Sequence, residues 1–198
     1  MKTVTGLFDN YDDATDVVGE LEASGVPRSD ISIVANNSDD WYRGDASAAG
    51  EDAASGAGIG AVVGGAGGLL TGLGVMAIPG VGPVVAAGWL AATAAGALAG
   101  AAAGGAVGGI VGGLTEHGVS EPDAHVYAEG VRRGGTLVTA RVEDELVANA
   151  EQILGQSRSV DLAERRTSYE SSGWTGFDPR AGEYVPEETD RGRMVNRP

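Results

Sequence analysis

A run of 63 residues without a charged side chain, from Ala53 to Thr115, constrains this 198-residue chain more than any other feature. It is dense in glycine and alanine, and Ile78-Pro79-Gly80-Val81-Gly82-Pro83 divides it near its middle. As α-helices, the segments at 55–77 and 84–114 would be about 34 Å and about 46 Å long. We therefore expect an α-helical hairpin over residues 53–115, with its turn at Pro79, Gly80, Gly82 and Pro83.

Glycine recurs at every fourth position in both segments of this insert. The series are Gly56, Gly60, Gly64, Gly68 and Gly72, and then Gly96, Gly100, Gly104, Gly108 and Gly112. Such a series removes side chains along one ridge and lets a second backbone approach closely. The pattern predicts a glycine zipper whose helices pack together and assemble the chain into a homo-oligomer.

Two environments agree with such a hairpin. Its segments are long enough for a hydrocarbon core of roughly 30 Å, and a hairpin returns both flanks to one side, which predicts membrane association with the flanking domain in the cytoplasm. Glycine and alanine are only weakly hydrophobic, however, and the nearest charges, Asp52 and Glu116, are acidic rather than basic. The alternative is a cytoplasmic, soluble regulatory or ligand-binding module whose hairpin folds onto the sheet or forms the core of an oligomer.

The flanks of the insert have an α+β pattern. Residues 1–36 read as strand, helix and strand, and residues 116–166 as helix, strand, helix and a short last strand at 159–162. With the insert removed, the order βαβ-(α)-βαβ predicts a ferredoxin-like sandwich. Residues 37–52 read as an acidic linker, and residues 167–198 as a disordered tail.

Aromatic side chains occur in both of these polar segments. Trp41 and Tyr42 suit either a membrane interface or packing on the sheet. Trp174, Phe177 and Tyr184 in the tail either form a docking motif for an unknown protein or have no function.

Composition and spacing argue against several functions. The net charge of −15 is unsuited to nucleic-acid binding, and the first ten residues do not resemble a secretory signal. His117 and His125 would need a third metal ligand, such as Glu121 or Glu129, and two surface histidines are the simpler interpretation. The glycine-rich strings follow no strand and lack an acidic partner, which excludes dinucleotide binding. We expect no catalytic residue, no metal, no cofactor and no enzymatic activity.

Arg132-Arg133-Gly134-Gly135 is the best polar candidate for a binding site. Two guanidiniums before glycine amides can hold an anion, so Arg132 and Arg133 are candidate anion contacts. Cations are also favoured at a helix C-terminus without any ligand.

Three features together resemble a known family. They are the βαβ opening from Val4 to Val34, the Gly/Ala block with Ala77-Ile78-Pro79-Gly80-Val81-Gly82-Pro83, and the run from Gly118 to Gly135 that contains Tyr127-Ala128-Glu129-Gly130-Val131-Arg132-Arg133. Over about residues 2–165 the chain resembles the bacterial general stress, or YflT-type heat- and low-temperature-induced, protein family. The resemblance implies a stress-response protein and supplies no catalytic residues.

Overall fold

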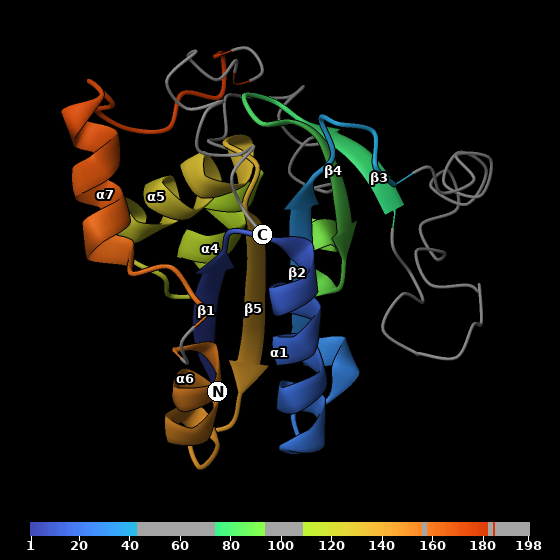
Figure 1. The fold of residues 1–198 in the computed structure, drawn as a ribbon. Helices are drawn as coiled ribbons and strands as arrows, with labels where there is room; N and C mark the ends of the chain where they lie inside the picture. The colour runs from blue at the N-terminus through green and yellow to red at the C-terminus, as the bar shows by residue number, and fades with distance from the viewer. Residues whose placement is uncertain (43–73, 94–108, 156–157, 182–183, 185–198) are drawn as a thin grey trace.

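The computed structural model describes residues 1–42, 74–93, 109–155, 158–181 and 184 (Figure 1). In chain order the elements are β1 (Lys2–Phe8), α1 (Tyr11–Ala23), the 3-10 turn η1 (Arg28–Asp30), β2 (Ile31–Asn36), β3 (Gly74–Ile78), β4 (Gly82–Ala87), α4 (Ile110–Glu116), α5 (Glu121–Arg132), β5 (Thr136–Val142), α6 (Val147–Leu154) and α7 (Leu162–Ser171). The predicted mixed α+β class is confirmed.

The described strands form one sheet in the order β1-β5-β2-β4-β3, in which all neighbours are antiparallel. β5 lies between β1 and β2, so the parts of the chain before and after the insert are joined by sheet pairing. The predicted fourth strand at 159–162 is wrong as a strand. A single bridge joins Ser159 to Phe8, and α7 already begins at Leu162, because the Asp161 side chain caps it by accepting from the Glu164 amide.

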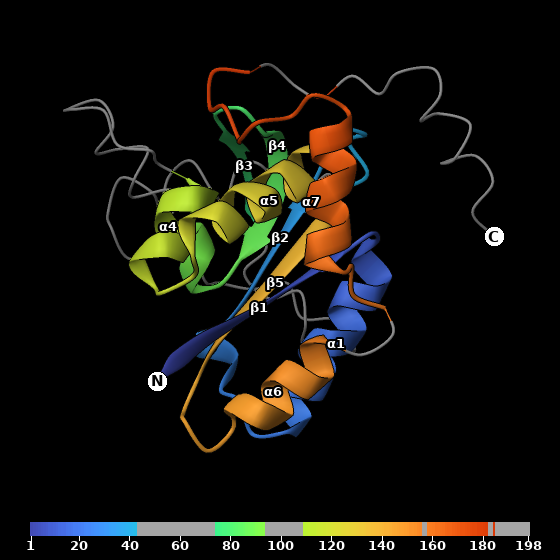
Figure 2. The same ribbon diagram turned by 90° about the vertical axis from the view of Figure 1, so that its left-hand side faces the viewer.

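Helices cover both faces of the sheet (Figure 2). α1 and α6 lie on one face, where their apolar side chains pack with alternate residues of β1, β2 and β5, such as Phe8, Ile33 and Val138. α4 and α5 lie on the opposite face, packed on Val34 and Leu137. Capping side chains explain where two of these helices start, since Asn10 accepts from the Asp13 amide and Ser120 from the Asp123 amide.

The turn of the insert is in the predicted place, but it joins strands instead of helices. The Val81 amide donates to the Ile78 carbonyl at 3.0 Å, and Gly80 has a φ of +78°, as expected for Pro at the second and Gly at the third position of a type II turn. β3 and β4 flank this turn, and β4 pairs with the edge of β2. The predicted helical conformation is therefore wrong for residues 74–77 and 84–87, which lie in β3 and β4.

The second predicted helix, over 84–114, is also not a single straight helix. Residues 89–93 are helical, as is α4, but the two lie side by side: a Cβ added at Gly113 would be 2.7 Å from the Leu90 Cδ1 atom. The two ends of one straight helix could not make this contact. Of the ten ridge glycines only Gly112 is described, and it is partly exposed; the other nine, and the first segment up to residue 73, lie outside the described residues.

Membrane association is contradicted. Over the ranges that the structure describes, no helix combines the length and apolar character needed to cross a membrane. The uncharged residues at the described ends of the insert form part of the protein core. Their side chains are almost completely buried, with at most 1% exposure for Val84, Leu90, Ile110 and Leu114. Burial against the sheet explains why these positions carry no charge.

The predicted disordered tail starts too early. Thr167 lies inside α7, and Tyr169 and Phe177 are buried at 3% and 7% exposure. Only residues 182–183 and 185–198 of this tail lie outside the described residues. In the predicted linker, Trp41 packs on α1, with its ring centroid 4.8 Å from that of Tyr11, while 43–52 is not described.

Candidate functional site

Arg132 and Arg133 lie at the C-terminal end of α5, as predicted, but the glycine amides beside them are already used. The Gly134 amide donates to the Val131 carbonyl at 3.0 Å and the Gly135 amide to the Gly130 carbonyl at 2.9 Å. Both bonds close the end of the helix, in the manner expected of glycine at a C-terminus. The predicted pairing of guanidiniums with free glycine amides is therefore not formed.

Both guanidiniums bind the same buried carboxylate. Glu129 is 2% exposed, and its Oε1 atom accepts from Nη1 of Arg132 at 3.0 Å and from Nε of Arg133 at 2.6 Å. The spacings of three and four residues put all three side chains on one side of α5. The cationic pair is thus partly neutralised from within its own helix.

The C-terminal segment covers the outer side of this pair. The Arg133 guanidinium lies 4.3 Å from the ring centroid of Tyr169 and 4.8 Å from that of Tyr184, and Arg132 lies 5.4 Å from Tyr184. Burial raises the pKa of the Tyr169 phenol, so it stays neutral near pH 7. We call these five residues, Glu129, Arg132, Arg133, Tyr169 and Tyr184, the Glu129 cluster.

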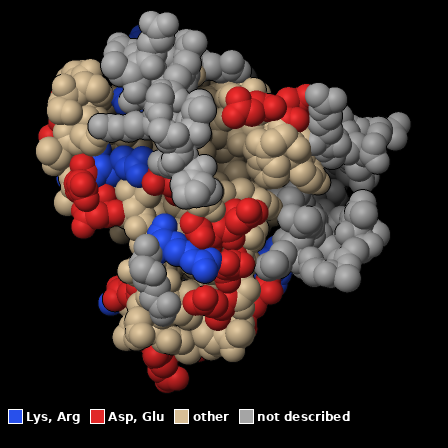
Figure 3. Space-filling model, viewed as in Figure 1, with Lys and Arg blue, Asp and Glu red and all other residues tan. Residues whose placement is uncertain are grey.

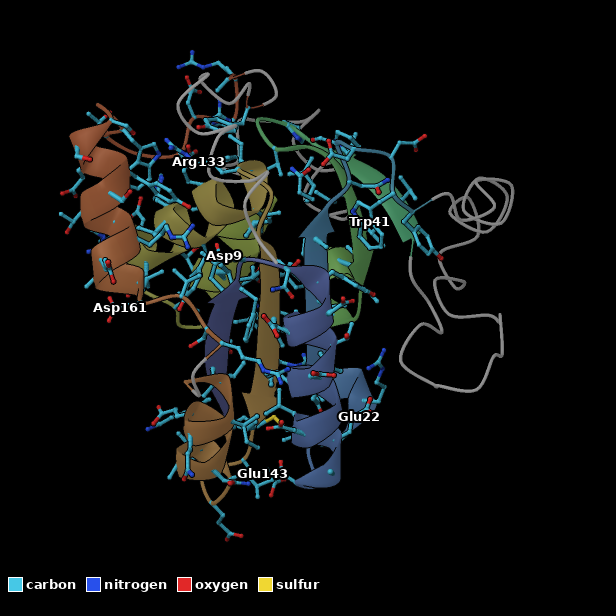
Figure 4. The ribbon with its side chains drawn as sticks, viewed as in Figure 1. Asp9, Glu22, Trp41, Arg133, Glu143 and Asp161 are labelled. Carbon is cyan, nitrogen blue, oxygen red and sulfur yellow. The ribbon has the colours of Figure 1, made fainter. Side chains whose placement is uncertain are left out.

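Ion pairs fix α7 beside the cluster. Arg165 binds Asp9, after β1, at 2.7 Å, and Arg166 binds Asp123, on α5, at 2.6 Å. Figure 4 places Asp9 and Arg133 between α7 and the sheet, and Figure 3 shows that basic groups on this face border acidic ones. The Glu129 cluster therefore docks the C-terminal segment onto α5.

The two histidines have separate structural partners. His117 Nδ1 is 2.8 Å from the Gly113 carbonyl oxygen, and its ring lies 4.4 Å from that of Trp89. His125 Nδ1 accepts from the Phe177 amide at 3.0 Å. Within the described ranges no group of three or more His, Asp and Glu side chains is placed to hold a metal ion.

The structure brings together a polar group that the sequence analysis missed, on the sheet face below α4 and α5. Thr5 on β1, Thr139 on β5 and Ser32 on β2 are direct neighbours across three strands, so their side chains lie in one row. Ser32 Oγ donates to the Ala87 carbonyl at 2.6 Å. Thr139 is fully buried, yet the Oγ1 atoms of Thr5 and Thr139 have no hydrogen-bond partner.

Arg141 extends this group by one row. Its side chain is on the same face as Thr139 because it lies two residues further along β5. Nη2 donates to the Asp30 carboxylate at 2.7 Å, and the guanidinium lies 5.1 Å from the Trp89 ring, while Nε is buried without a partner. We call Thr5, Ser32, Thr139 and Arg141 the sheet-face cluster.

The residues of the sheet-face cluster come from strands that are far apart in the chain, so no local sequence motif predicts the cluster. Threonine is a common strand former. In the sequence, Thr139 therefore indicates only that residues 136–142 form a strand. The available signal is the alternation along β5, since Thr139 and Arg141 share a face with the apolar Leu137.

No family model matches the chain, and neither a curated protein nor a solved structure does.

Proposed function

We propose that this chain is a non-enzymatic stress-response protein of the YflT type. The observation that carries the proposal is the position of the two motifs most specific to the resemblance. Ile78, Val81 and Val84, in and beside the Pro-Gly turn, belong to the same buried cluster as Ala128 and Val131 from the run that ends at Gly135. Both motifs therefore contribute apolar side chains to one core, and the proposal gives them a structural role.

The order and placement of the elements support a ferredoxin-like core. β1-α1-β2 and β5-α6 with the bridge at Ser159 give the order 159, β1, β5, β2, with α1 and α6 on one face. Two interlocked βαβ units of this kind define the ferredoxin-like arrangement. The β3-β4 hairpin then extends the β2 edge, and α4 and α5 close the opposite face.

The proposed mode of action is self-association through the glycine ridges of the insert. The contact between Gly113 and Leu90 supports it, because a glycine on α4 lets a neighbouring helical segment approach closely. Gly113 is next to the ridge residue Gly112 and is not itself on the ridge. Helix pairing along the ridges would make the same type of contact between copies of the chain.

The stress role is tested in the source cell by measuring the amount of this protein before and after heat, cold and salt exposure. We expect a several-fold rise under at least one stress and lower survival of a deletion strain under that stress. Unchanged abundance together with normal survival under all three conditions would overturn the proposal.

Self-association is tested by light scattering of the purified full chain after size separation. Gly104→Leu, on a ridge, should reduce the particle mass. Gly19→Leu is the control, because a Cβ at Gly19 on α1 meets nothing within 4 Å. A monomeric wild-type chain, or equal oligomer mass in both variants, would exclude ridge packing between copies.

A further inference from the structure

We propose that His125 holds residues 174–181 against the Pro-Gly turn only while its imidazole is neutral, so that protonation of His125 releases them. We call residues 174–181 the Phe177 segment. The inference adds an acid-sensitive contact to the fold, and it does not depend on the proposed stress role.

The Phe177 segment covers the turn between β3 and β4. Figure 2 shows the chain passing from α7 toward this turn. Phe177 belongs to the same buried cluster as Ile78 and Val81. A Cβ added at Gly80 would be 2.6 Å from the Asp178 carbonyl oxygen and 3.0 Å from the Phe177 Cζ atom, so the segment touches the turn directly. Its release would expose apolar side chains of the turn.

One hydrogen bond between the segment and α5 fixes the position of the proton on His125. The Phe177 amide donates to His125 Nδ1 at 3.0 Å. A backbone amide can only donate, so Nδ1 carries no proton and the neutral ring holds its proton on Nε2. An imidazolium has an N–H on both nitrogens. Protonated His125 would therefore turn a donor toward the Phe177 amide, and the bond would be lost.

The loss is costly because the contact is largely shielded from water. Phe177 is 7% exposed and the His125 side chain 24%. A buried N–H without an acceptor costs more free energy than its hydrogen bond contributes. Opening of the segment lets water bind the amide, so the charged ring favours the open segment. Histidine is the side chain that ordinarily changes charge between pH 5 and pH 8, which sets the range in which the segment responds.

The charged groups around His125 leave Nδ1 to the Phe177 amide. Glu121, one turn earlier on α5, has its Oε1 atom 3.9 Å from Nε2, the nitrogen that is protonated in both charge states. The other charged groups on the elements around α5 include Glu116 on α4, Asp123 on α5 paired with Arg166 on α7, and Asp178 paired with Arg180 on the Phe177 segment. Within the described residues, Glu121 is thus the carboxylate that pairs with the ring.

His117 has a contact of the opposite polarity. Its Nδ1 atom is 2.8 Å from the Gly113 carbonyl oxygen, and a carbonyl can only accept, so this Nδ1 carries the proton. Protonation of His117 adds a proton to Nε2 and leaves the bond to Gly113 intact. Of the two histidines in the chain, His125 is therefore the one whose hydrogen bond is lost in acid.

The test measures amide hydrogen exchange of the purified full chain at about pH 7.5 and about pH 5, on either side of the histidine range. Protection factors are compared, because they correct for the intrinsic pH dependence of exchange. We expect peptides over the Phe177 segment to lose protection at least tenfold at the lower pH, while β5 keeps its protection. His125→Asn offers an amide oxygen that accepts without titrating, so its segment should be equally protected at both pH values. His117→Gln is the matched control and should respond as the wild type does.

A second measurement keeps the test decisive if His125→Asn does not fold. Nitrogen NMR of the wild-type imidazoles at about pH 7.5, where histidine is mainly neutral, should find the proton on Nε2 of His125 and on Nδ1 of His117. The proposal is overturned if the wild-type segment is equally protected at both pH values or if His125→Asn still loses protection in acid. A proton on Nδ1 of His125 in the neutral ring would overturn it as well.

Discussion

Glu129 is the only carboxylate among the described residues that is withdrawn almost completely from water. A buried carboxylate is tolerated when charged partners satisfy it, and Arg132 and Arg133 do so from the same helix. Arg132 and Arg133 were singled out in the sequence as anion contacts, and the anion they bind is a side chain of the protein itself. The sequence could not show this, because the exposure of Glu129 depends on α7 docking over α5.

Replacing Glu129 with Gln should lower the free energy of unfolding by about 2–3 kcal/mol. Removing one partner of a buried ion pair leaves the other charge uncompensated, and the arginines, at 17% and 20% exposure, can turn only partly to water. Urea unfolding measures the loss. Asp178→Asn, in the exposed pair with Arg180, should cost less than about 0.5 kcal/mol, and an equal loss in both variants would show that the Glu129 cluster does not stabilise the fold.

Tyr127 should make stability depend on pH in the alkaline range. Burial raises its pKa to about 12 in the folded protein, from about 10 when unfolded. The folded state therefore holds its proton more tightly, and the resulting stability is present below pH 10 and is lost as the pH rises through 12. Burial likewise raises the pKa of Tyr11 to about 12, with the same sign.

A shift of two pKa units corresponds to roughly 2–3 kcal/mol for the well-buried Tyr127. The urea midpoint measured between pH 8 and pH 11.5 should fall above pH 10. Tyr127→Phe should fall less steeply and retain the part due to Tyr11. A wild-type curve that is flat over this range, or identical slopes in the two proteins, would contradict the account of Tyr127.

At the scale of elements, the capped helices and the alternating strands were predictable, whereas the insert was not. α1, α5, β1, β2 and β5 appear where capping side chains and apolar spacing place them. In the insert, glycine and alanine fit helix and strand patterns alike, so tertiary contacts decide whether a segment forms a helix or a strand. β4 becomes a strand because the open edge of β2 is available to pair with it.

Gly113 carries the contact between the two helical ends of the insert. Gly113→Leu should lower the free energy of unfolding by about 2–3 kcal/mol, because the added side chain must displace Leu90, which is 1% exposed. Leu90→Ala in the same chain should recover part of the loss, as measured by a double-mutant cycle. Gly19→Ala, in open space on α1, should instead stabilise by about 0.5–1 kcal/mol, and strict additivity of Gly113→Leu and Leu90→Ala would argue against this packing.

At the scale of the molecule, segments from three parts of the sequence cover one sheet. The described ends of the insert build much of the core on the α4 and α5 face, and α7 with Phe177 closes that side from outside. The two polar clusters arise only from this assembly. The Glu129 cluster needs α7, and the sheet-face cluster needs Trp89 and the register of β1, β2 and β5, so neither follows from a local pattern.

The central claim is that the ends of the insert are integral to the fold. Amide hydrogen exchange of the full chain, read by mass spectrometry, tests it most directly. We expect peptides over residues 82–91 and 110–116 to be protected to a degree similar to β5, because their amides lie in strands and helices of the same core. Complete exchange of both peptides within seconds, while β5 stays protected, would show that the insert is not part of the core.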